Sequence, residues 1–319
     1  MLDARTIRKL ASYVELIPLM SKTLAAVSRG EAELPLRWGM QVPGEGGVLV
    51  MMPGFLGSEA SAGIKLLSLA PKQADRSSHL GVMMLYDANL LPVAMLCGAT
   101  VTALRTAATT ACATDVLAPK GARQLAILGS GEQADAHLAA LQLVRNFTSI
   151  RIWNRTRANA LALATRYAQT GSNIEVCDSV ETAVNEADVI CTLTSSATPV
   201  LAGQRVANGV HVNLVGSSSR SSRETDDDLV TRSRFFVEFK KSALNQAGEL
   251  LGAIERGRVT EQHIAAEIGE VIAGTHPGRT SPSDLTVFKS VGVAAEDIAL
   301  AAHIHRKAEQ LGLGQMVEL

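Results

Sequence analysis

The sequence predicts an α/β protein: a doubly wound parallel sheet of the Rossmann type, joined to a discontinuous α+β domain. Three observations carry this prediction. A short apolar run at residues 125–128 ends in Gly-x-Gly-x-x-Ala at residues 129–134, and helical periodicity continues to about residue 145. A second apolar run follows at residues 150–153. Helical and β-like segments then alternate as far as residue 237, which is the pattern of parallel strands joined by right-handed crossovers.

The N-terminal third has a different pattern. Apolar residues at helical spacing predict one helix over residues 9–28, and short β-like runs follow at 47–52, 62–69, 81–86 and 91–96. The last two runs are expected to pair as a hairpin around Asp87-Ala88-Asn89. A helix is predicted at 101–117, and a final helix at about 294–311 is long enough to return to this N-terminal unit. We therefore place one domain at 1–118 with 297–319, and the other at 119–296.

Composition excludes several classes of protein. The 319 residues carry a net charge of −1, so no long-range attraction for nucleic acid or an acidic membrane is expected. The four cysteines lack Cys-x-x-Cys spacing and nearby His clusters, which argues against a metal site or a disulfide framework. No apolar stretch has the length of a membrane span or a signal peptide. The sequence predicts a cytoplasmic protein without metal, nucleic-acid or membrane partners.

The glycine turn predicts a dinucleotide site, because such a turn brings backbone close to a pyrophosphate and points a helix N-terminus at its charge. The segment that follows the second strand, residues 154–157, contains no carboxylate for a ribose 2′-hydroxyl but does contain two arginines. We therefore predict NADPH, with NADH as an alternative, and Arg155 as the main ligand of the 2′-phosphate. The competing interpretation makes both arginines solvated charges. The cofactor residues expected here are Gly129, Gly131, Glu132, Gln133, Asn154, Arg155, Thr156 and Arg157.

Small, hydroxyl-rich segments follow three further apolar runs. Ligands of open parallel sheets bind beyond the carboxyl ends of the strands, so these segments are expected at the nicotinamide ring. The contacts expected there are Thr192, Thr194, Ser195, Val215, Gly216, Ser217, Ser290, Val291 and Gly292. The serine cluster at 217–222 is alternatively a flexible loop. No serine in it has the Gly-x-Ser-x-Gly context of a hydrolase nucleophile, so acyl transfer is not predicted.

Three cations of the N-terminal part, Arg37, Lys65 and Arg105, are candidate substrate ligands. Lys65 and Arg105 stand inside aliphatic runs, where a buried charge is costly unless it is paired. Each therefore faces solvent, pairs internally or binds an anion. Together with a dinucleotide site and no metal motif, these cations suggest a small carboxylate substrate.

Four ordered segments resemble the ornithine cyclodeaminase/μ-crystallin family: TALRTAA at 102–108, GSGEQA at 129–134, IWNRT at 152–156 and TVFKSVG at 286–292. The resemblance covers essentially the whole chain. It implies an NAD(P)-binding Rossmann domain and a discontinuous substrate-binding and dimerisation domain, in a homodimer that joins the N-terminal sheets. It also implies that Arg37, Lys65 and Arg105 bind the substrate carboxylate, and Arg105 and Thr106 are expected at the cofactor as well.

The sequence departs from the cyclodeaminases of that family at one position. They carry an aspartate where this chain has Ser218, and a hydroxyl cannot replace a carboxylate base without a neighbouring activator. Cyclisation with loss of ammonia is therefore disfavoured, and Ser78-His79 also resembles the μ-crystallin type. The resemblance then implies an NAD(P)H-dependent oxidoreductase that acts on an imine bond, a ketimine reductase.

The expected substrate is a cyclic imine carboxylate. The expected reaction reduces Δ1-pyrroline-2-carboxylate to L-proline, with Δ1-piperideine-2-carboxylate to L-pipecolate as a second reaction. Lys65 or His79 would supply the proton to the imine nitrogen, and Ser218 would orient that nitrogen or a water. The alternatives are an ornithine cyclodeaminase, an alanine dehydrogenase, an opine-like condensing enzyme, and a non-enzymatic μ-crystallin-like protein that holds NADPH and a ligand.

Overall fold

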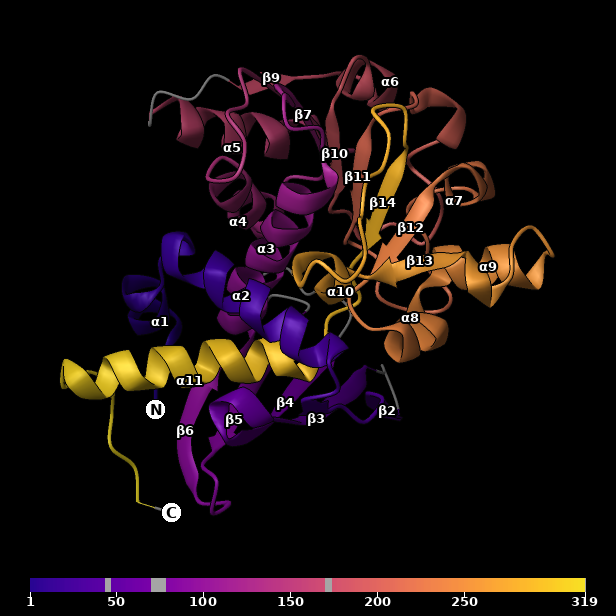
Figure 1. Ribbon diagram of the computed structural model, residues 1–319. Coiled ribbons are helices and arrows are strands. Elements are labelled where there is room, and N and C mark those ends of the chain that lie inside the picture. Colours follow the sequence, from indigo (N-terminus) through magenta and orange to yellow (C-terminus); the bar gives the residue numbers. More distant parts are fainter. Residues whose placement is uncertain (44–46, 70–78, 170–173, 319) are drawn as a thin grey trace. The chain divides into compact units, whose positions relative to one another are not determined.

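The computed structural model describes residues 1–43, 47–69, 79–169 and 174–318, and the chain separates into two compact units (Figure 1). The first unit contains Met1–Thr106 and Val293–Leu319, and the second contains Ala107–Gly292. These boundaries differ from the expected 118/119 and 296/297. The first falls inside helix α3 (Gly98–Leu117), because the start of α3 bonds to the N-terminal sheet and its later turns bond to the parallel sheet.

The first unit is built on an antiparallel sheet with the order β1-β3-β4-β5-β6, and β2 also pairs with β3. Its strands are β1 (Ala32–Glu33), β2 (Trp38–Gln41), β3 (Val48–Leu56), β4 (Ser61–Leu69), β5 (His79–Tyr86) and β6 (Pro92–Cys97). The predicted hairpin is confirmed, since β5 pairs antiparallel with β6. The Asp87 carboxylate closes its turn by accepting the N–H groups of Asn89 and Leu91.

Helix α11 (Ala294–Gln310) packs closely on this sheet, as predicted for the final helix. Glycines make the close approach feasible. A Cβ atom added at Gly54 in β3 would lie 2.9 Å from the Cβ of Ala294, and one added at Gly63 in β4 would lie 2.9 Å from Ile298. The N-terminal turn of α11 is thereby brought onto the sheet, and this turn carries two adjacent carboxylates.

The helix expected over residues 9–28 is confirmed over residues 13–28, but its predicted start is wrong. The structure has α1 (Ala4–Leu10) and α2 (Tyr13–Ser28), bent by 90° at the break between them. Asp3 caps α1 by accepting the N–H of Thr6, and the extended backbone of Ala11 and Ser12 separates the two helices. Within the described ranges, no single helix is long and apolar enough to cross a membrane. Among the described helices, only α1 and α2 taken together have the length and apolar composition of a membrane span.

The second unit is built on an eight-stranded sheet with the order β13-β12-β14-β11-β10-β7-β8-β9, in which every pairing is parallel. The predicted α/β fold class is confirmed. The strands are β7 (Gln124–Leu128), β8 (Ser149–Trp153), β9 (Ile174–Val176), β10 (Val189–Thr192), β11 (His211–Leu214), β12 (Arg234–Val237), β13 (Ile264–Glu267) and β14 (Thr286–Lys289). The sequence predicted a strand end at residues 289–292 without bounds for the strand itself, and this buried strand, β14, lies between β11 and β12.

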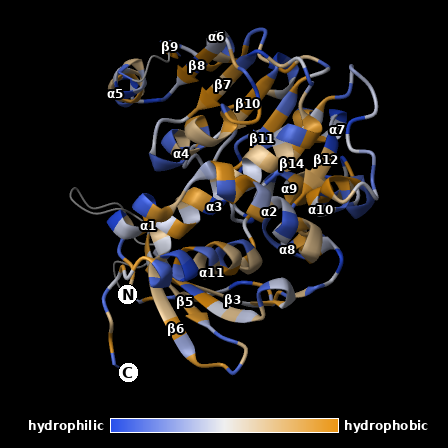
Figure 2. Cartoon of the chain, turned by 60° about the vertical axis from the view of Figure 1, so that its left-hand side comes forward, coloured by the Kyte–Doolittle hydropathy of each residue, from blue (hydrophilic) through white to orange (hydrophobic). Residues whose placement is uncertain are grey.

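Helices cover both faces of the parallel sheet, and its strands are largely hydrophobic (Figure 2). Alternate residues such as Ile190 and Val212 join one apolar core with α6, α7, α8 and α9. On the opposite face, Asn213 donates to the Thr114 hydroxyl of α3 at 3.0 Å. The helices of this unit, besides the later turns of α3, are α4 (Glu132–Leu141), α5 (Arg157–Ala168), α6 (Val180–Val184), α7 (Asp227–Arg232), α8 (Lys240–Gln246), α9 (Gly248–Glu255) and α10 (Ile268–Ile272).

Two histidines are buried on the α3 side of this sheet. The Nδ1 atom of His137 lies 2.7 Å from the carbonyl oxygen of Gln133 and its Nε2 lies 3.0 Å from the Thr110 hydroxyl, so Nδ1 carries the proton. The Nε2 atom of His211 lies 3.1 Å from Oδ1 of Asn213. Because burial penalises the charged imidazolium, the pKa of His137 falls to about 4 and that of His211 to about 3.

Candidate functional site

The predicted glycine turn joins β7 to α4 and has room on one side for an anion. Gly129 has φ +123°, and a Cβ there would lie 2.4 Å from the carbonyl oxygen of Leu193. Gly131 is the N-cap residue of α4, and a Cβ there would meet no atom within 4 Å. Glu132 and Gln133 open the helix. The space beside Gly131, at the N-terminus of α4, is therefore open, as a bound pyrophosphate would require.

The segment after β8 contains two arginines with different surroundings. Arg157 forms an exposed ion pair with Asp178 at 2.7 Å. Arg155 is also exposed, and the described residues place no carboxylate within ion-pair distance of it. Asn154 donates to the carbonyl oxygen of Thr156, which shapes the turn. Arg155 is therefore the better placed of the two to receive a phosphate.

A buried glutamate organises the ends of β10 and β11. Glu224 accepts the hydroxyl of Thr192 (2.6 Å), the N–H and hydroxyl of Thr194 (both 2.7 Å) and the N–H of Gly216 (2.7 Å). Burial raises the pKa of Glu224, and Lys289 and these hydrogen bonds oppose that change. Sequence analysis placed these hydroxyls at the nicotinamide ring. The structure shows that they bond to the protein's own carboxylate, while the hydroxyl-bearing Ser195 next to them is exposed.

Glu238 has the same role at the end of β14. It follows β12 directly and accepts the hydroxyl of Ser290 (2.6 Å) and the N–H groups of Val291 (2.9 Å) and Gly292 (2.6 Å). The residues expected at the cofactor in this turn are buried and bonded within the second unit. Two buried carboxylates thus shape three of the predicted cofactor segments, although neither was predicted as a site residue.

Lys65 and Arg105 form a buried charge cluster in the first unit. Lys65 is 1% exposed and donates to Oδ1 of Asp297 at 2.8 Å and to the Thr102 hydroxyl at 3.1 Å. Arg105 donates through Nε to Asp297 at 3.1 Å and through Nη1 to Glu296 at 2.7 Å. Both cations are paired internally, so the interpretation that they face solvent is wrong. Lys65 from β4 and Arg105 from α3 therefore meet at the N-terminal turn of α11, which carries both carboxylates.

Burial and neighbouring charges together set the protonation of Lys65. Burial lowers the pKa of Lys65 to about 8, Asp297 opposes this change, and the charges of Arg105 and Arg37 lower the pKa further. Arg37 precedes β2 and is half-buried. The three predicted carboxylate ligands therefore influence one another electrostatically. Thr106 also lies on α3, where its hydroxyl bonds back to the carbonyl oxygen of Thr102.

The two remaining catalytic candidates are His79 and Ser218, and the structure describes the side chain of Ser218 only. His79 opens β5, but its side chain is outside what the structure describes, as is the whole of Ser78. Ser218 follows β11 in an exposed position, and no described residue accepts or donates a hydrogen bond to its hydroxyl. Its neighbour Ser217 is buried, and the Ser217 hydroxyl donates to the carbonyl oxygen of Ser222.

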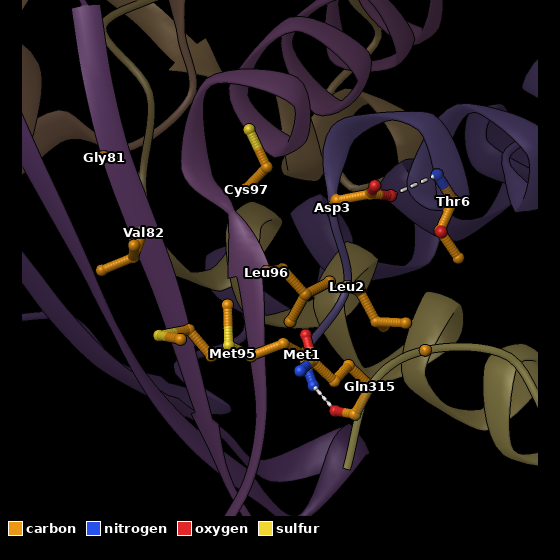
Figure 3. Close-up of a pocket in the computed structure, with 11 residues that line it drawn as sticks. Met1, Leu2, Asp3, Thr6, Gly81, Val82, Met95, Leu96, Cys97 and Gln315 are labelled. Atoms are coloured by element: carbon orange, nitrogen blue, oxygen red, sulfur yellow. Dashed lines mark hydrogen bonds between the residues drawn. The ribbon is translucent and has the colours of Figure 1, made fainter. Parts of the chain in front are cut away.

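A cavity of about 480 Å³ lies elsewhere in the first unit, between the start of the chain and β6 (Figure 3). Met95, Leu96 and Cys97 line it from β6, and the amino group of Met1 bonds there to the carbonyl oxygen of Gln315. No predicted site residue lines this cavity. It is therefore separate from the charge cluster around Lys65.

Sequence comparison assigns the chain to a family. Residues 1–312 match the ornithine cyclodeaminase/mu-crystallin family. The chain belongs to that family. Two curated relatives are the Delta(1)-pyrroline-2-carboxylate reductase of Bacillus cereus (strain ZK / E33L), 32% identical over 99% of both chains, and the ketimine reductase mu-crystallin of Mus musculus, 36% identical over 91% of both chains.

Two solved structures superpose closely on this chain. The Delta(1)-pyrroline-2-carboxylate reductase of Thermococcus litoralis, in complex with NADH and L-proline, has a TM-score of 0.95 at 32% identity and covers 99% of both chains. An archaeal alanine dehydrogenase dimer with bound NAD has a TM-score of 0.92 at 26% identity, covering 99% of this chain and 98% of that one. The resemblance found in the four sequence segments is confirmed.

The carboxylates that pair with Lys65 and Arg105 were not predicted from the sequence. Glu296 and Asp297 stand in an alanine-rich helix and are fully buried, which is a signal that they need cationic partners. An analogous signal was present for Lys289, a lysine that follows Val287 and Phe288 and comes directly before Ser290, Val291 and Gly292. Matching buried carboxylates to buried cations would have suggested both clusters, whereas the individual pairs depend on the fold.

Proposed function

We propose that this protein reduces a cyclic ketimine carboxylate, Δ1-pyrroline-2-carboxylate above all, to the corresponding cyclic amino acid with NADPH or NADH. The observation that carries the proposal is the buried cluster of Lys65, Arg105 and Asp297 in a chain with a dinucleotide turn. It is supported by relatives and a solved structure that are named as reductases of this imine class. Reduction of Δ1-piperideine-2-carboxylate is the second reaction we propose.

The substrate carboxylate would bind to Lys65 and Arg105, with Arg37 adding to the positive field. Arginine offers a planar pair of donors that matches a carboxylate. The lysine ammonium has three donors, and the described contacts with Thr102 and Asp297 account for two of them. A substrate anion would also offset the positive charges of Arg105 and Arg37, which add to the effect of burial on the Lys65 pKa. The cluster thus favours a small carboxylate over a neutral ligand.

The bound cofactor would supply a hydride to the imine carbon. The turn at Gly129 and Gly131 and the amides at the start of α4 would hold its pyrophosphate. Arg155 would bind a 2′-phosphate, which favours NADPH over NADH. Thr194, Gly216 and Val291, shaped by Glu224 and Glu238, would form the nicotinamide side of the site.

An imine accepts hydride well only when its nitrogen is protonated. Lys65 is the donor we propose, because its lowered pKa makes proton release easier than from an ordinary lysine. His79 is the alternative donor. Ser218 would orient the nitrogen or a water through its hydroxyl, and as a neutral alcohol it would not act as a strong base. A preformed iminium requires no such base, whereas removal of ammonia from ornithine would.

We also propose a homodimer that joins the sheets of the two first units. Large apolar side chains are exposed on β2 and β3 at Trp38 (58%), Met40 (43%) and Phe55 (40%). A group of exposed apolar side chains on a sheet commonly marks an interface. The archaeal relative of 26% identity is described as a dimer. Light scattering coupled to gel filtration tests this, and a monomer at micromolar concentration would contradict it.

The reaction is tested by following NADPH absorbance with four substrates in parallel. We expect oxidation with both cyclic imines, faster with the pyrroline, and none with pyruvate plus ammonium. We expect no ammonia from ornithine. Arg105→Met should lower kcat/KM for the imine by roughly 100-fold, since a charge-assisted pair contributes about 1.5–3 kcal/mol. Absence of turnover with either imine would overturn the proposal, and ammonium-dependent reduction of pyruvate would replace it with alanine dehydrogenase.

A further inference from the structure

Lys289 is a fully buried lysine with no part in the reaction proposed above. It is the last residue of β14 and is level with Leu214 of β11 and Val237 of β12. Its ammonium lies 3.2 Å and 3.1 Å from the two carboxylate oxygens of Glu249 in α9, and both side chains are 0% exposed. The pair therefore lies at the carboxyl edge of the sheet, where ligands of such folds bind.

The pair is bonded to both ends of one loop, residues 217–224. Lys289 donates to the main-chain oxygen of Ser217, and Glu249 accepts the main-chain N–H of Glu224 at 3.0 Å. The next residue back from Glu249 is Gly248. A Cβ there would lie 2.1 Å from the carbonyl oxygen of Ser222. The start of α9 is thus in close contact with the loop that carries Ser218.

Stability alone does not account for this arrangement. Removing two charges from water costs several kcal/mol per ion, and well-packed apolar residues of similar volume are often equally stabilising or more so. A buried ion pair does, however, fix distances and directions that apolar packing leaves free, since each donor must meet its acceptor. Here the atoms so fixed are main-chain atoms at residues 217 and 224.

We propose that Lys289 and Glu249 are positioning residues that hold the loop of residues 217–224 so that Ser218 is presented to the substrate nitrogen. This inference rests on the proposed imine reduction for the role of Ser218. The two residues themselves touch neither substrate nor cofactor. They act through the main chain of Ser217 and Glu224, while the exposed Ser218 hydroxyl remains available to a ligand.

The test replaces the pair by apolar residues of similar volume, in K289M/E249L, so that neither member is left as an unpaired charge, while the buried Glu224 keeps its hydrogen bonds to Thr192, Thr194 and Gly216. We expect the melting temperature to stay within a few degrees of wild type. Amide hydrogen exchange in peptides covering residues 216–224 should become at least tenfold faster. With saturating cofactor, kcat for the imine should fall ten- to a hundredfold. The KM should change less than threefold, because Lys65 and Arg105 bind the carboxylate.

The matched control is Arg220→Ala. Arg220 and Glu255 form an ion pair between the same loop and the same helix, but this pair is exposed. Its removal should leave both exchange and kcat within twofold of wild type. Unchanged loop exchange and unchanged kcat in K289M/E249L would overturn the inference, as would equal effects in the control. If wild type reduces no cyclic imine, the proposed function fails, and the exchange measurement still decides whether the pair holds the loop.

Discussion

At the residue scale, the protonation state of Lys65 is governed by its neighbours. Burial lowers the pKa of this ammonium to about 8, and Asp297 offsets part of the effect, whereas Arg105 adds to it. The protonated form is the one that binds a carboxylate and can release a proton. The activity of the free enzyme is therefore expected to depend on Lys65 in its charged state.

We predict that kcat/KM for the cyclic imine is constant near pH 7 and falls as pH rises through about 8, because Lys65 loses its proton there. In Lys65→Arg the guanidinium stays charged, so the residual activity should keep no such limb below about pH 10. Initial rates at limiting substrate from pH 6 to 10 provide the measurement. If the limb persists unchanged in Lys65→Arg, another group or the imine itself titrates.

Arg155 and Arg157 give a second prediction at this scale. Arg155→Asp should weaken NADPH binding by roughly 10- to 100-fold, the range expected for loss of a charge-assisted phosphate contact, and should leave NADH binding nearly unchanged. Arg157→Asp is the control, since Arg157 already pairs with Asp178. Dissociation constants from cofactor fluorescence decide the matter. Equal NADPH affinity in the Arg155→Asp and Arg157→Asp variants would show that Arg155 does not bind the 2′-phosphate.

At the scale of elements, the β7–α4 turn contains two glycines that the structure requires for different reasons. A side chain at Gly129 would collide with the carbonyl oxygen of Leu193 in a left-handed backbone conformation. A side chain at Gly131 would meet nothing in the protein, although it would occupy the space we assign to the pyrophosphate. Substitution of Gly129 should therefore affect folding, and substitution of Gly131 should affect cofactor binding.

We predict that Gly129→Ala lowers the free energy of unfolding by about 1–3 kcal/mol, the cost of strain at such a position. Gly131→Ala should leave that free energy within about 0.5 kcal/mol of wild type but weaken NADPH binding at least tenfold. Urea unfolding and cofactor titration measure the two quantities. Unchanged NADPH affinity in Gly131→Ala would show that the pyrophosphate does not approach this residue.

Element prediction succeeded where periodicity was long and failed where tertiary contacts decide. The βαβ start and the final helix were predicted because apolar spacing and glycine positions are local signals. Strand β14 was recognised only by its end, since four residues containing Thr286 and Lys289 carry little apolar signal. The break between α1 and α2 was missed because Ser12 fits a helix interior and a helix start about equally well in an isolated sequence.

At the scale of the whole molecule, acid stability is expected to depend on the buried histidines. Their pKa values in the folded state, about 4 for His137 and about 3 for His211, lie below the ordinary value of 6.5. The unfolded chain therefore binds more protons between these values. The stabilisation is complete above pH 6.5 and is lost as pH falls towards 4, at a slope of up to about 1.4 kcal/mol per unit for each histidine.

The prediction is that the free energy of unfolding of wild type drops between pH 7 and pH 5 by more than that of His137→Gln. The difference in slope isolates one histidine, because other titrating groups are common to both proteins. Urea unfolding at several pH values measures it. Parallel pH dependence in the two proteins would show that His137 is protonated without cost in the folded state.

The fold class and the family were readable from four short segments, since glycine turns and paired motifs keep their spacing in the chain. Only the cations of the charge cluster could be predicted from the sequence. Lys65 and Arg105 could be recognised as unusual, but their partners could not, because nothing local links Lys65 to Asp297. The same holds for Glu224 and Glu238, whose role depends on which strands lie side by side.

The sequence separation of that cluster has a consequence for how the protein is made. Lys65 and Asp297 are 232 positions apart, and Arg105 and Glu296 are 191 apart. During synthesis the N-terminal sheet and the start of α3 leave the ribosome long before α11, whose carboxylates pair with Lys65 and Arg105. A nascent chain that has reached only residue 292 carries both cations without either partner. The sheet that begins the protein can therefore complete its interior only after nearly all of the second unit has been translated, which makes assembly of the first unit a late event.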